Sequence, residues 1–279
     1  MPRSANCRAR IDRLQLGARL SSQVAPPQTP DFTAVSDRFV RSQTSAHTYG
    51  RVREYRNPFT STRIFCQYQP GLPGLSPFKI TVIPDDRREL SREELLQIVR
   101  PFSNYRLLLI EIALDFAPES GVDLDFVSQS GVFGKSRKNA SRLYPLRALY
   151  GSRKGSKLAR CYWKGEVNSF RVELELHSAW LRRYGISKLK DLRKLPNLLS
   201  PSHIKFVHMD WKGLRKYLSN RGLHATDIIQ EARDKSDSIH EVMKFLRSSA
   251  GVNNAHRFLV TEHTNKNIQE SLEKWARDF

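Results

Sequence analysis

Two stretches of the chain alternate between apolar and ionisable positions, and one follows closely on the other. Side chains alternate across a strand with a period of two, so each stretch presents its ionisable groups on a single face. The connection 165–169 is short enough for a hairpin. The first strand, Leu158–Lys164, carries Arg160, Tyr162 and Lys164 on this face, and the second, Phe170–His177, carries Arg171, Glu173, Glu175 and His177.

The remaining pattern predicts a mixed fold. Strands are expected over 59–68, 78–83 and 107–116, and a helix is expected after the N-cap candidate Ser91. Residues 117–145 are polar and basic and indicate a loop or insertion. Further helices are expected over 178–184, 187–194, 202–220, 224–234, 237–249 and 264–278. We therefore predict an α+β protein, with an antiparallel sheet that has helices packed on one face, followed by a helical C-terminal region.

This reading divides the chain into a basic, disordered arm (1–45), an α+β core (46–185) and a helical region (186–279). Residues 1–30 are rich in arginine, and we prefer a disordered arm to an organellar transit peptide for them. The helix face of the sheet should pack against helices over 92–100 and 178–184. The apolar residues expected on that face are Ile110, Ile112, Leu114, Cys161, Trp163, Val172 and Leu174.

Charge indicates the class of partner. The 279 residues include 47 Lys and Arg against 28 Asp and Glu, which gives a formal net charge of +19. Nucleic acid is the leading partner for such a protein, because neutralising phosphates releases condensed counterions. An anionic membrane surface is the second choice, although no apolar run is long enough to span a bilayer. The three cysteines show no metal-ligand or disulfide spacing.

Carboxylates recur on the face that carries Tyr162. Glu111 and Asp115 are four residues apart on one predicted strand, and Glu173 and Glu175 repeat the pattern on another. A solvated sheet face would explain them without any function. A metal site would also explain them, because hard divalent cations such as Mg²⁺ or Mn²⁺ take oxygen ligands. His177 continues the same face, either as a ligand or as a structural residue.

Tyr162 is a candidate nucleophile. Arg160 and Lys164 flank it on the same face, where cations favour a phenolate and bind a phosphate. A divalent metal nearby would polarise a scissile phosphate. The alternative is an aromatic side chain that simply packs on the sheet. The turn Gly151–Ser156 carries Arg153 and Lys154, which with Lys157 and Arg171 are candidate contacts to a DNA backbone.

Three motifs resemble the core of rolling-circle replication initiators of the Rep-trans group, and filamentous-phage initiators carry related patterns. These motifs are Tyr150-Gly-Ser-Arg-Lys-Gly-Ser156, Arg160-Cys-Tyr-Trp-Lys164 and Arg171-Val-Glu-Leu-Glu-Leu176, and Ile110–Asp115 resembles a fourth. Glu111 stands where the group usually has Asp, Leu109 replaces an Arg, and the turn is one residue shorter. By this resemblance Tyr162 would be the nucleophile, and Glu111, Glu173 and Asp115 would hold the metal.

The resemblance implies an enzyme that nicks and rejoins one DNA strand at the origin of a plasmid, phage or integrated element. Its partners would be single-stranded or cruciform origin DNA and a host helicase, with no membrane, in the cytoplasm. The basic segment from Trp211 to Arg221 opens a candidate helix-turn-helix at 212–234. Two alternatives stay open: a non-catalytic DNA- or RNA-binding protein, and a metal-dependent nuclease that uses water.

Overall fold

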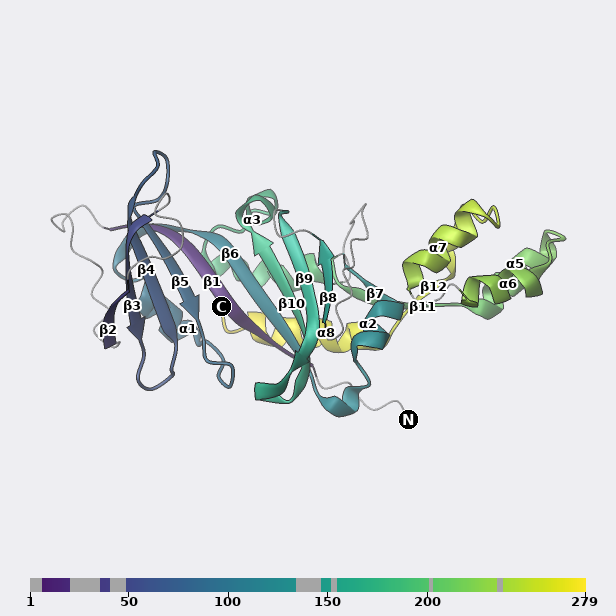
Figure 1. Cartoon of the computed structure of the whole chain (residues 1–279), viewed down its shortest axis with the longest axis horizontal. Helices are drawn as coiled ribbons and strands as arrows, with labels where there is room; N and C mark the ends of the chain where they lie inside the picture. Colours follow the sequence, from purple (N-terminus) through teal and green to yellow (C-terminus); the bar gives the residue numbers. More distant parts are fainter. Residues whose placement is uncertain are drawn as a thin grey trace.

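The fold is built on a large antiparallel sheet. The computed structural model describes residues 7–20, 36–40, 49–133, 147–151, 155–200, 203–234 and 238–279. Nine strands pair in the order β2-β3-β4-β5-β1-β6-β10-β9-β8 (Figure 1). In chain order they are β1 (Cys7–Leu20), β2 (Ser36–Val40), β3 (Tyr49–Arg56), β4 (Arg63–Pro70), β5 (Phe78–Ile83), β6 (Phe102–Phe116), β8 (Arg147–Gly151), β9 (Lys157–Lys164) and β10 (Ser169–His177).

The N-terminal segment lies at the centre of this sheet. The expectation of a disordered arm is wrong for Cys7–Leu20, because β1 pairs with β5 on one side and with β6 on the other. Its apolar side chains, such as Ile11, Leu14 and Leu16, are fully or almost fully buried. Burial of these side chains outweighs the arginine-rich composition and fixes the strand.

The predicted hairpin is formed by β9 and β10. The one-turn helix η2 (Gly165–Val167) connects the two strands, and Asn168 closes the turn with a positive φ of 47°. Arg160 pairs with Glu173 and Tyr162 pairs with Arg171 across the hairpin. On its other edge β10 pairs with β6, so that Arg171 lies opposite Asp115 and Glu175 lies opposite Glu111. Directly paired residues point to the same face, so these side chains share one side of the sheet.

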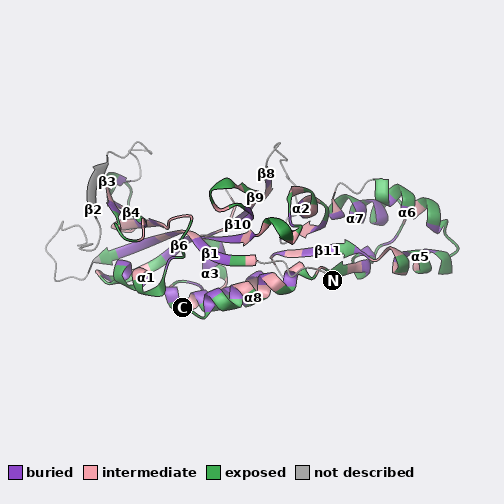
Figure 2. Cartoon of the chain, turned by 90° about the horizontal axis from the view of Figure 1, so that it is seen from below, coloured by how far each residue is buried: buried purple, intermediate pink, exposed green. Residues whose placement is uncertain are grey.

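Helices cover the opposite face. The helices α1 (Arg92–Val99), α3 (Ser178–Arg183) and α8 (Thr264–Ala276) lie along one side of the sheet (Figure 2). As expected, Ser91 caps α1 by accepting a hydrogen bond from the backbone N–H of Glu94. The residues predicted for this face are buried in the main core, apart from Trp163, which is 49% exposed near the end of β9.

The C-terminal region is less uniformly helical than expected. The predicted helix over 202–220 is wrong in its first part, where Lys205–Met209 forms β11 before α5 (Trp211–Asn220) begins. β11 pairs with β12 (Leu259–Thr261) and β7 (Gly131–Val132). A helix also occurs within the predicted loop 117–145, α2 (Leu124–Ser130). The helical elements before β11 are η3 (Leu189–Lys194) and α4 (Leu195–Leu199).

A second, smaller core forms beside the main one. It is built by α5, α6 (Ala225–Asp234) and α7 (Ile239–Ser248), which project from one end of the molecule (Figure 1). α8 returns from there to the sheet, and the Ser271 hydroxyl accepts a hydrogen bond from the backbone of Ala9. The predicted fold class, α+β with an antiparallel sheet covered on one face, is confirmed. Within the described residues, no helix combines the length and the apolar character that spanning a membrane requires.

Candidate functional site

Four adjacent strands, β1, β6, β10 and β9, bring ionisable side chains together on the face opposite the helices. On β6 the site positions are Glu111, Ala113 and Asp115, with Ala113 directly opposite Glu173. Ala113 is fully buried, and its methyl group is the smallest side chain that an L-residue can place there. Side chains from the strands on either side of β6 can therefore approach each other above it.

Asp12 enters the site through a β-bulge. The pairing of β1 with β6 shifts between Ile11 and Arg13, so Asp12 is the extra residue on β1. A bulge re-aims the side chains next to it. We did not predict Asp12 from the sequence, where it was the one acidic residue among the arginines of the first 30 positions. A single acidic residue in an otherwise basic segment was the feature of the sequence that could have indicated a functional role for Asp12.

Three carboxylates converge. Asp12, Glu111 and Glu173 each offer an oxygen, and these oxygens lie within 4.8 Å of one another. Glu111 and Glu173 are buried, and Asp12 is partly buried. Burial and the charge of Glu173 raise the pKa of Asp12 above its ordinary value, and Arg171 opposes this shift. Like charges at such spacing favour either a proton or a cation between them.

Tyr162 lies beside this cluster. Its hydroxyl donates a hydrogen bond to Oε1 of Glu173. Burial raises the pKa of Tyr162, and the charge and hydrogen bond of Glu173 raise it further, against the opposing charge of Arg171. The phenol is therefore held in its protonated form, with its proton directed at a carboxylate that can accept it.

Arginines neutralise part of the carboxylate charge. Arg160 contacts Glu111 with one guanidinium nitrogen and places Nε 2.8 Å from Glu173. Arg13 places Nε 2.9 Å from Glu111 and Nη2 3.1 Å from Glu175. Either Lys164 or Arg160 was expected at the tyrosine hydroxyl, but the guanidinium of Arg160 contacts carboxylates. These ion pairs hold Glu111 and Glu173 in place.

Arg171 is fully buried, and its guanidinium binds carboxylates inside the protein instead of facing solvent. It contacts Asp115 through Nε at 2.6 Å and Nη2 at 3.1 Å, and Asp12 through Nη1 at 2.8 Å. The expectation that Arg171 contacts DNA is wrong, because no part of its side chain reaches solvent. Asp115, expected as a metal ligand, instead pairs with Arg171 and with Arg10 at 3.1 Å.

The other predicted residues lie outside the cluster of Asp12, Glu111 and Glu173. Lys164 lies 3.1 Å from Asp86, a residue that we did not predict, and not at the Tyr162 hydroxyl. Glu175 lies outside the convergent set and pairs with His177 at 2.7 Å. Lys157 lies on the helix face, because its position is out of phase with Tyr162 along β9.

Two predicted DNA contacts, Arg153 and Lys154, lie outside the described residues.

The three carboxylates suit a hard divalent cation by their chemistry. Their oxygens lie within 4.8 Å of one another, close enough to share one cation, and Arg160 also contacts Oε1 of Glu111. The residues present therefore fit a bound Mg²⁺ or Mn²⁺, with Asp12, Glu111 and Glu173 as its ligands.

Fold and site together define an α+β protein with a buried carboxylate cluster beside a tyrosine hydroxyl. No protein-family model matches the sequence, and no curated protein matches it. Among solved structures, the chain is similar to the rolling circle replication initiator protein from Geobacillus stearothermophilus. That similarity has a TM-score of 0.46 and 10% sequence identity, and it covers 72% of this chain and 87% of the other.

Proposed function

We propose that the protein initiates rolling-circle replication by nicking and rejoining one DNA strand, with Tyr162 as the nucleophile. The observation that carries this proposal is the hydrogen bond from the Tyr162 hydroxyl to Glu173, within a cluster of three convergent carboxylates. A net charge of +19 supports a nucleic acid as the substrate. The origin would belong to a plasmid, a phage or an integrated element.

In the proposed reaction, Oη of Tyr162 attacks the phosphorus of the scissile phosphodiester. The new bond joins phosphorus to Oη, the bond from phosphorus to the 3′ oxygen breaks, and the leaving 3′ oxygen takes up a proton from water. Glu173 accepts the phenol proton, for which its hydrogen bond already provides the path. The phosphotyrosyl bond conserves the energy of the phosphodiester, so a free 3′ hydroxyl can later reverse the step.

A divalent cation at Asp12, Glu111 and Glu173 would polarise the phosphate and lower the pKa of nearby hydroxyl groups. The residues of the chain supply the remaining requirements. Arg160 and Arg13 fix two of the carboxylates, and Lys164 lies two residues from Tyr162 on the same face of β9. Lys164 would bind the phosphate next to the scissile one after exchanging its contact with Asp86.

A second reading has one observation in its favour. The pKa of Tyr162 is raised, so the hydroxyl is a weaker nucleophile until the charge around Glu173 changes. A metal-dependent nuclease that activates water would use the same carboxylates and would need no tyrosine. A protein that binds DNA without cleaving it would need neither the tyrosine nor the cation.

Two substitutions separate these three readings. The protein and its variants are incubated with single-stranded oligonucleotides that tile the replicon, with Mn²⁺, and the products are resolved on denaturing gels. Nicking by Tyr162 predicts cleavage in the wild type and none in Tyr162→Phe or Glu173→Gln. A water-activating nuclease would keep cleavage in Tyr162→Phe and lose it in Glu173→Gln. Binding without cleavage in all three proteins would leave only the non-catalytic reading.

A further inference from the structure

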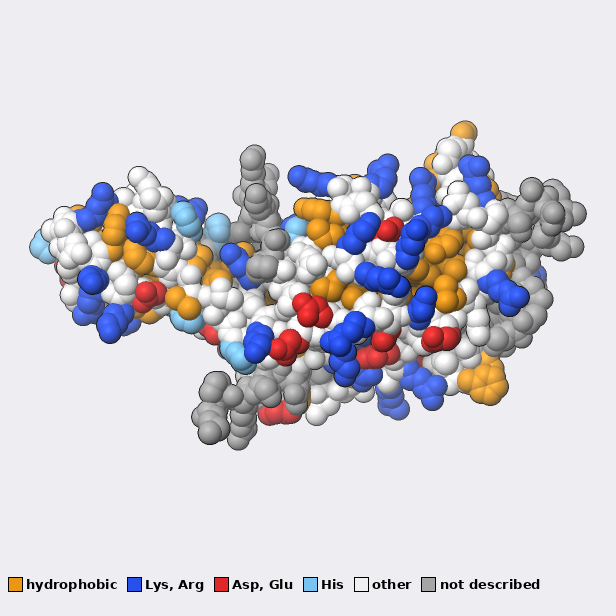
Figure 3. Space-filling view, turned by 180° about the vertical axis from the view of Figure 1, so that it is seen from behind, with side chains coloured by type: hydrophobic (Ala, Val, Ile, Leu, Met, Phe, Trp, Pro, Cys, Tyr) orange, Lys and Arg blue, Asp and Glu red, His pale blue; other side chains and the backbone are white. Residues whose placement is uncertain are grey.

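A basic pocket lies on the helix face of the sheet, away from the carboxylate cluster. Its lining comes from α1, from the first residues of β6, from η3 and the loop before it, and from Phe279. Tyr105 in this lining packs against the main core, whereas Glu111 on the same strand points to the other face. Figure 3, which shows the helix face, has Lys and Arg side chains around an apolar area.

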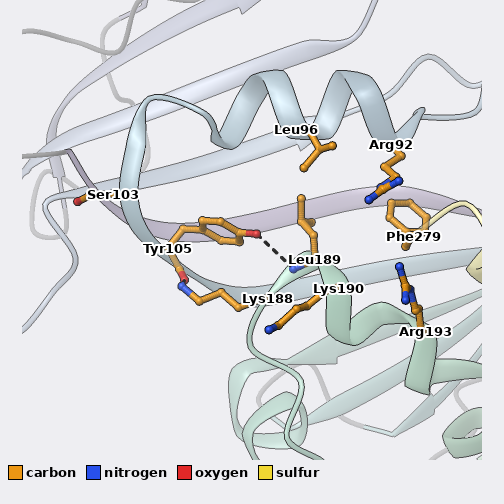
Figure 4. A pocket seen from close by; sticks show the side chains of 9 residues that line it. All are labelled: Arg92, Leu96, Ser103, Tyr105, Lys188, Leu189, Lys190, Arg193 and Phe279. Atoms are coloured by element: carbon orange, nitrogen blue, oxygen red, sulfur yellow. Dashed lines mark hydrogen bonds between the residues drawn. The ribbon is translucent and has the colours of Figure 1, made fainter.

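The charged side chains that line the pocket are all positive. Its lining includes Arg92, Lys188, Lys190 and Arg193, and no Asp or Glu (Figure 4). The ammonium group of Lys188 contacts neutral groups: Nζ lies 2.7 Å from the Asn104 side-chain oxygen and 4.5 Å from the centre of the Tyr105 ring. Arg92, Lys190 and Arg193 are exposed, and no ion pair within the described part of the chain involves them. The pocket is therefore suited to an anion.

The floor of the pocket is apolar. Leu189 and Phe279 are buried beneath it, and Leu96 is 46% exposed at its edge. The cavity holds about 320 Å³, at the lower end of the range for small-ligand sites. That volume accommodates one or two apolar side chains, so the complementary ligand combines negative charges with an apolar anchor.

We propose that this pocket binds an acidic peptide segment of a partner protein through an apolar side chain flanked by carboxylates. Arginine and lysine clusters recognise acidic motifs in this way. Nucleic acid fits less well. Lys188 already lies over the Tyr105 ring, and Phe279, the other aromatic residue of the lining, is only 4% exposed. Leu96 and Leu189 are aliphatic, so no ring offers an open face on which a base could stack.

The test measures binding of a fluorescein-labelled peptide, Asp-Asp-Asp-Asp-Leu-Phe, by fluorescence anisotropy at physiological salt. Two control peptides separate the contributions: one carries Asn in place of Asp, and the other ends in Gly-Ser instead of Leu-Phe. The proposal expects saturable binding of the first peptide, and weaker binding of both controls. The double variant Lys190→Glu/Arg193→Glu should weaken binding by about tenfold or more.

The matched control is Arg100→Glu/Lys274→Glu, which changes the net charge equally at exposed positions outside the pocket. It should change peptide affinity by about twofold or less. Equal loss in both double variants would mean non-specific attraction and would overturn the proposal. Absence of binding to the wild type would also overturn it. So would a thymidine oligonucleotide that competes with the peptide and loses affinity only in Lys190→Glu/Arg193→Glu, because the pocket would then bind DNA.

Discussion

Replacing Arg171 by Met tests whether the buried cation holds the site together. Arg171 is fully buried, and its guanidinium contacts Asp115 twice and Asp12 once. Met keeps the length of the aliphatic stem and removes the charge. Asp115 and Asp12, whose side chains are 11% and 22% exposed, would then lose their main partner where water reaches them only in part.

The expected cost follows from that burial. Removing one partner of a buried ion pair destabilises a protein by about 3–5 kcal/mol, because the remaining charge stays desolvated. Arg10 keeps one contact with Asp115, at 3.1 Å, so the lower end of the range applies. We expect Arg171→Met to lower the free energy of unfolding by about 3 kcal/mol.

The control is Arg8→Met, which removes a cation of β1 that lies 2.6 Å from Glu89 at the surface. The side chains of Arg8 and Glu89 are 60% and 43% exposed, so the loss should stay within about 1 kcal/mol. Urea unfolding followed by circular dichroism measures both. If Arg171→Met costs no more than Arg8→Met, Arg171 does not carry the buried charge of the site and the reasoning fails.

Three further predictions follow from other parts of the chain. Ala113→Leu fills the space above β6 in which the carboxylates meet. Mn²⁺ at a hundredfold excess over its Kd should stabilise the wild type by about 2.7 kcal/mol, and thermal unfolding should show almost no such stabilisation of the variant. Burial opposes ionisation of Asp191, but two backbone N–H groups and a lysine outweigh it and lower its pKa to about 2. Asp191→Asn should therefore cost about 1 kcal/mol above pH 3.8, and unfolding curves should show that difference vanish as the pH falls through 2. Replacing the exposed Lys212, Arg215 and Lys216 of α5 by Glu should weaken duplex-origin binding in gel-shift assays and leave cleavage of short single strands unchanged; loss of both would contradict a separate reading helix.

The sequence predicted local elements better than long-range ones. β5 begins and ends where its apolar run predicted, and α1 begins after the cap at Ser91. β1 was missed because its bulges break the period of two, and because the arginines that alternate with its apolar residues are typical of a disordered arm. β11 was missed because a short apolar run between helices has no periodicity that separates strand from helix.

For the candidate site too, the sequence predicted the features that depend on single strands and missed those that depend on long-range pairing. Alternation within single strands placed Glu111, Tyr162 and Glu173 on one face, and the register of β6, β10 and β9 agrees. Asp12 could not be predicted, because its place depends on the pairing of β1 with a strand about 100 residues further along the chain and on a bulge in that pairing. Alternation also could not predict which cation meets which carboxylate, since side-chain contacts depend on rotamers and on neighbouring strands.

The most direct test of the proposed chemistry identifies the residue that becomes joined to DNA. Trypsin cleaves after Arg160 and Lys164, which releases the peptide Cys161–Lys164 with Tyr162 as its single tyrosine. The protein is incubated with its cleaved oligonucleotide and Mn²⁺, the DNA is trimmed with a nuclease, and the peptides are measured by mass spectrometry. The expected result is a 5′-phosphonucleotide on Tyr162 in this peptide. Cleavage of the oligonucleotide with no adduct, or with the adduct on another residue, would contradict it.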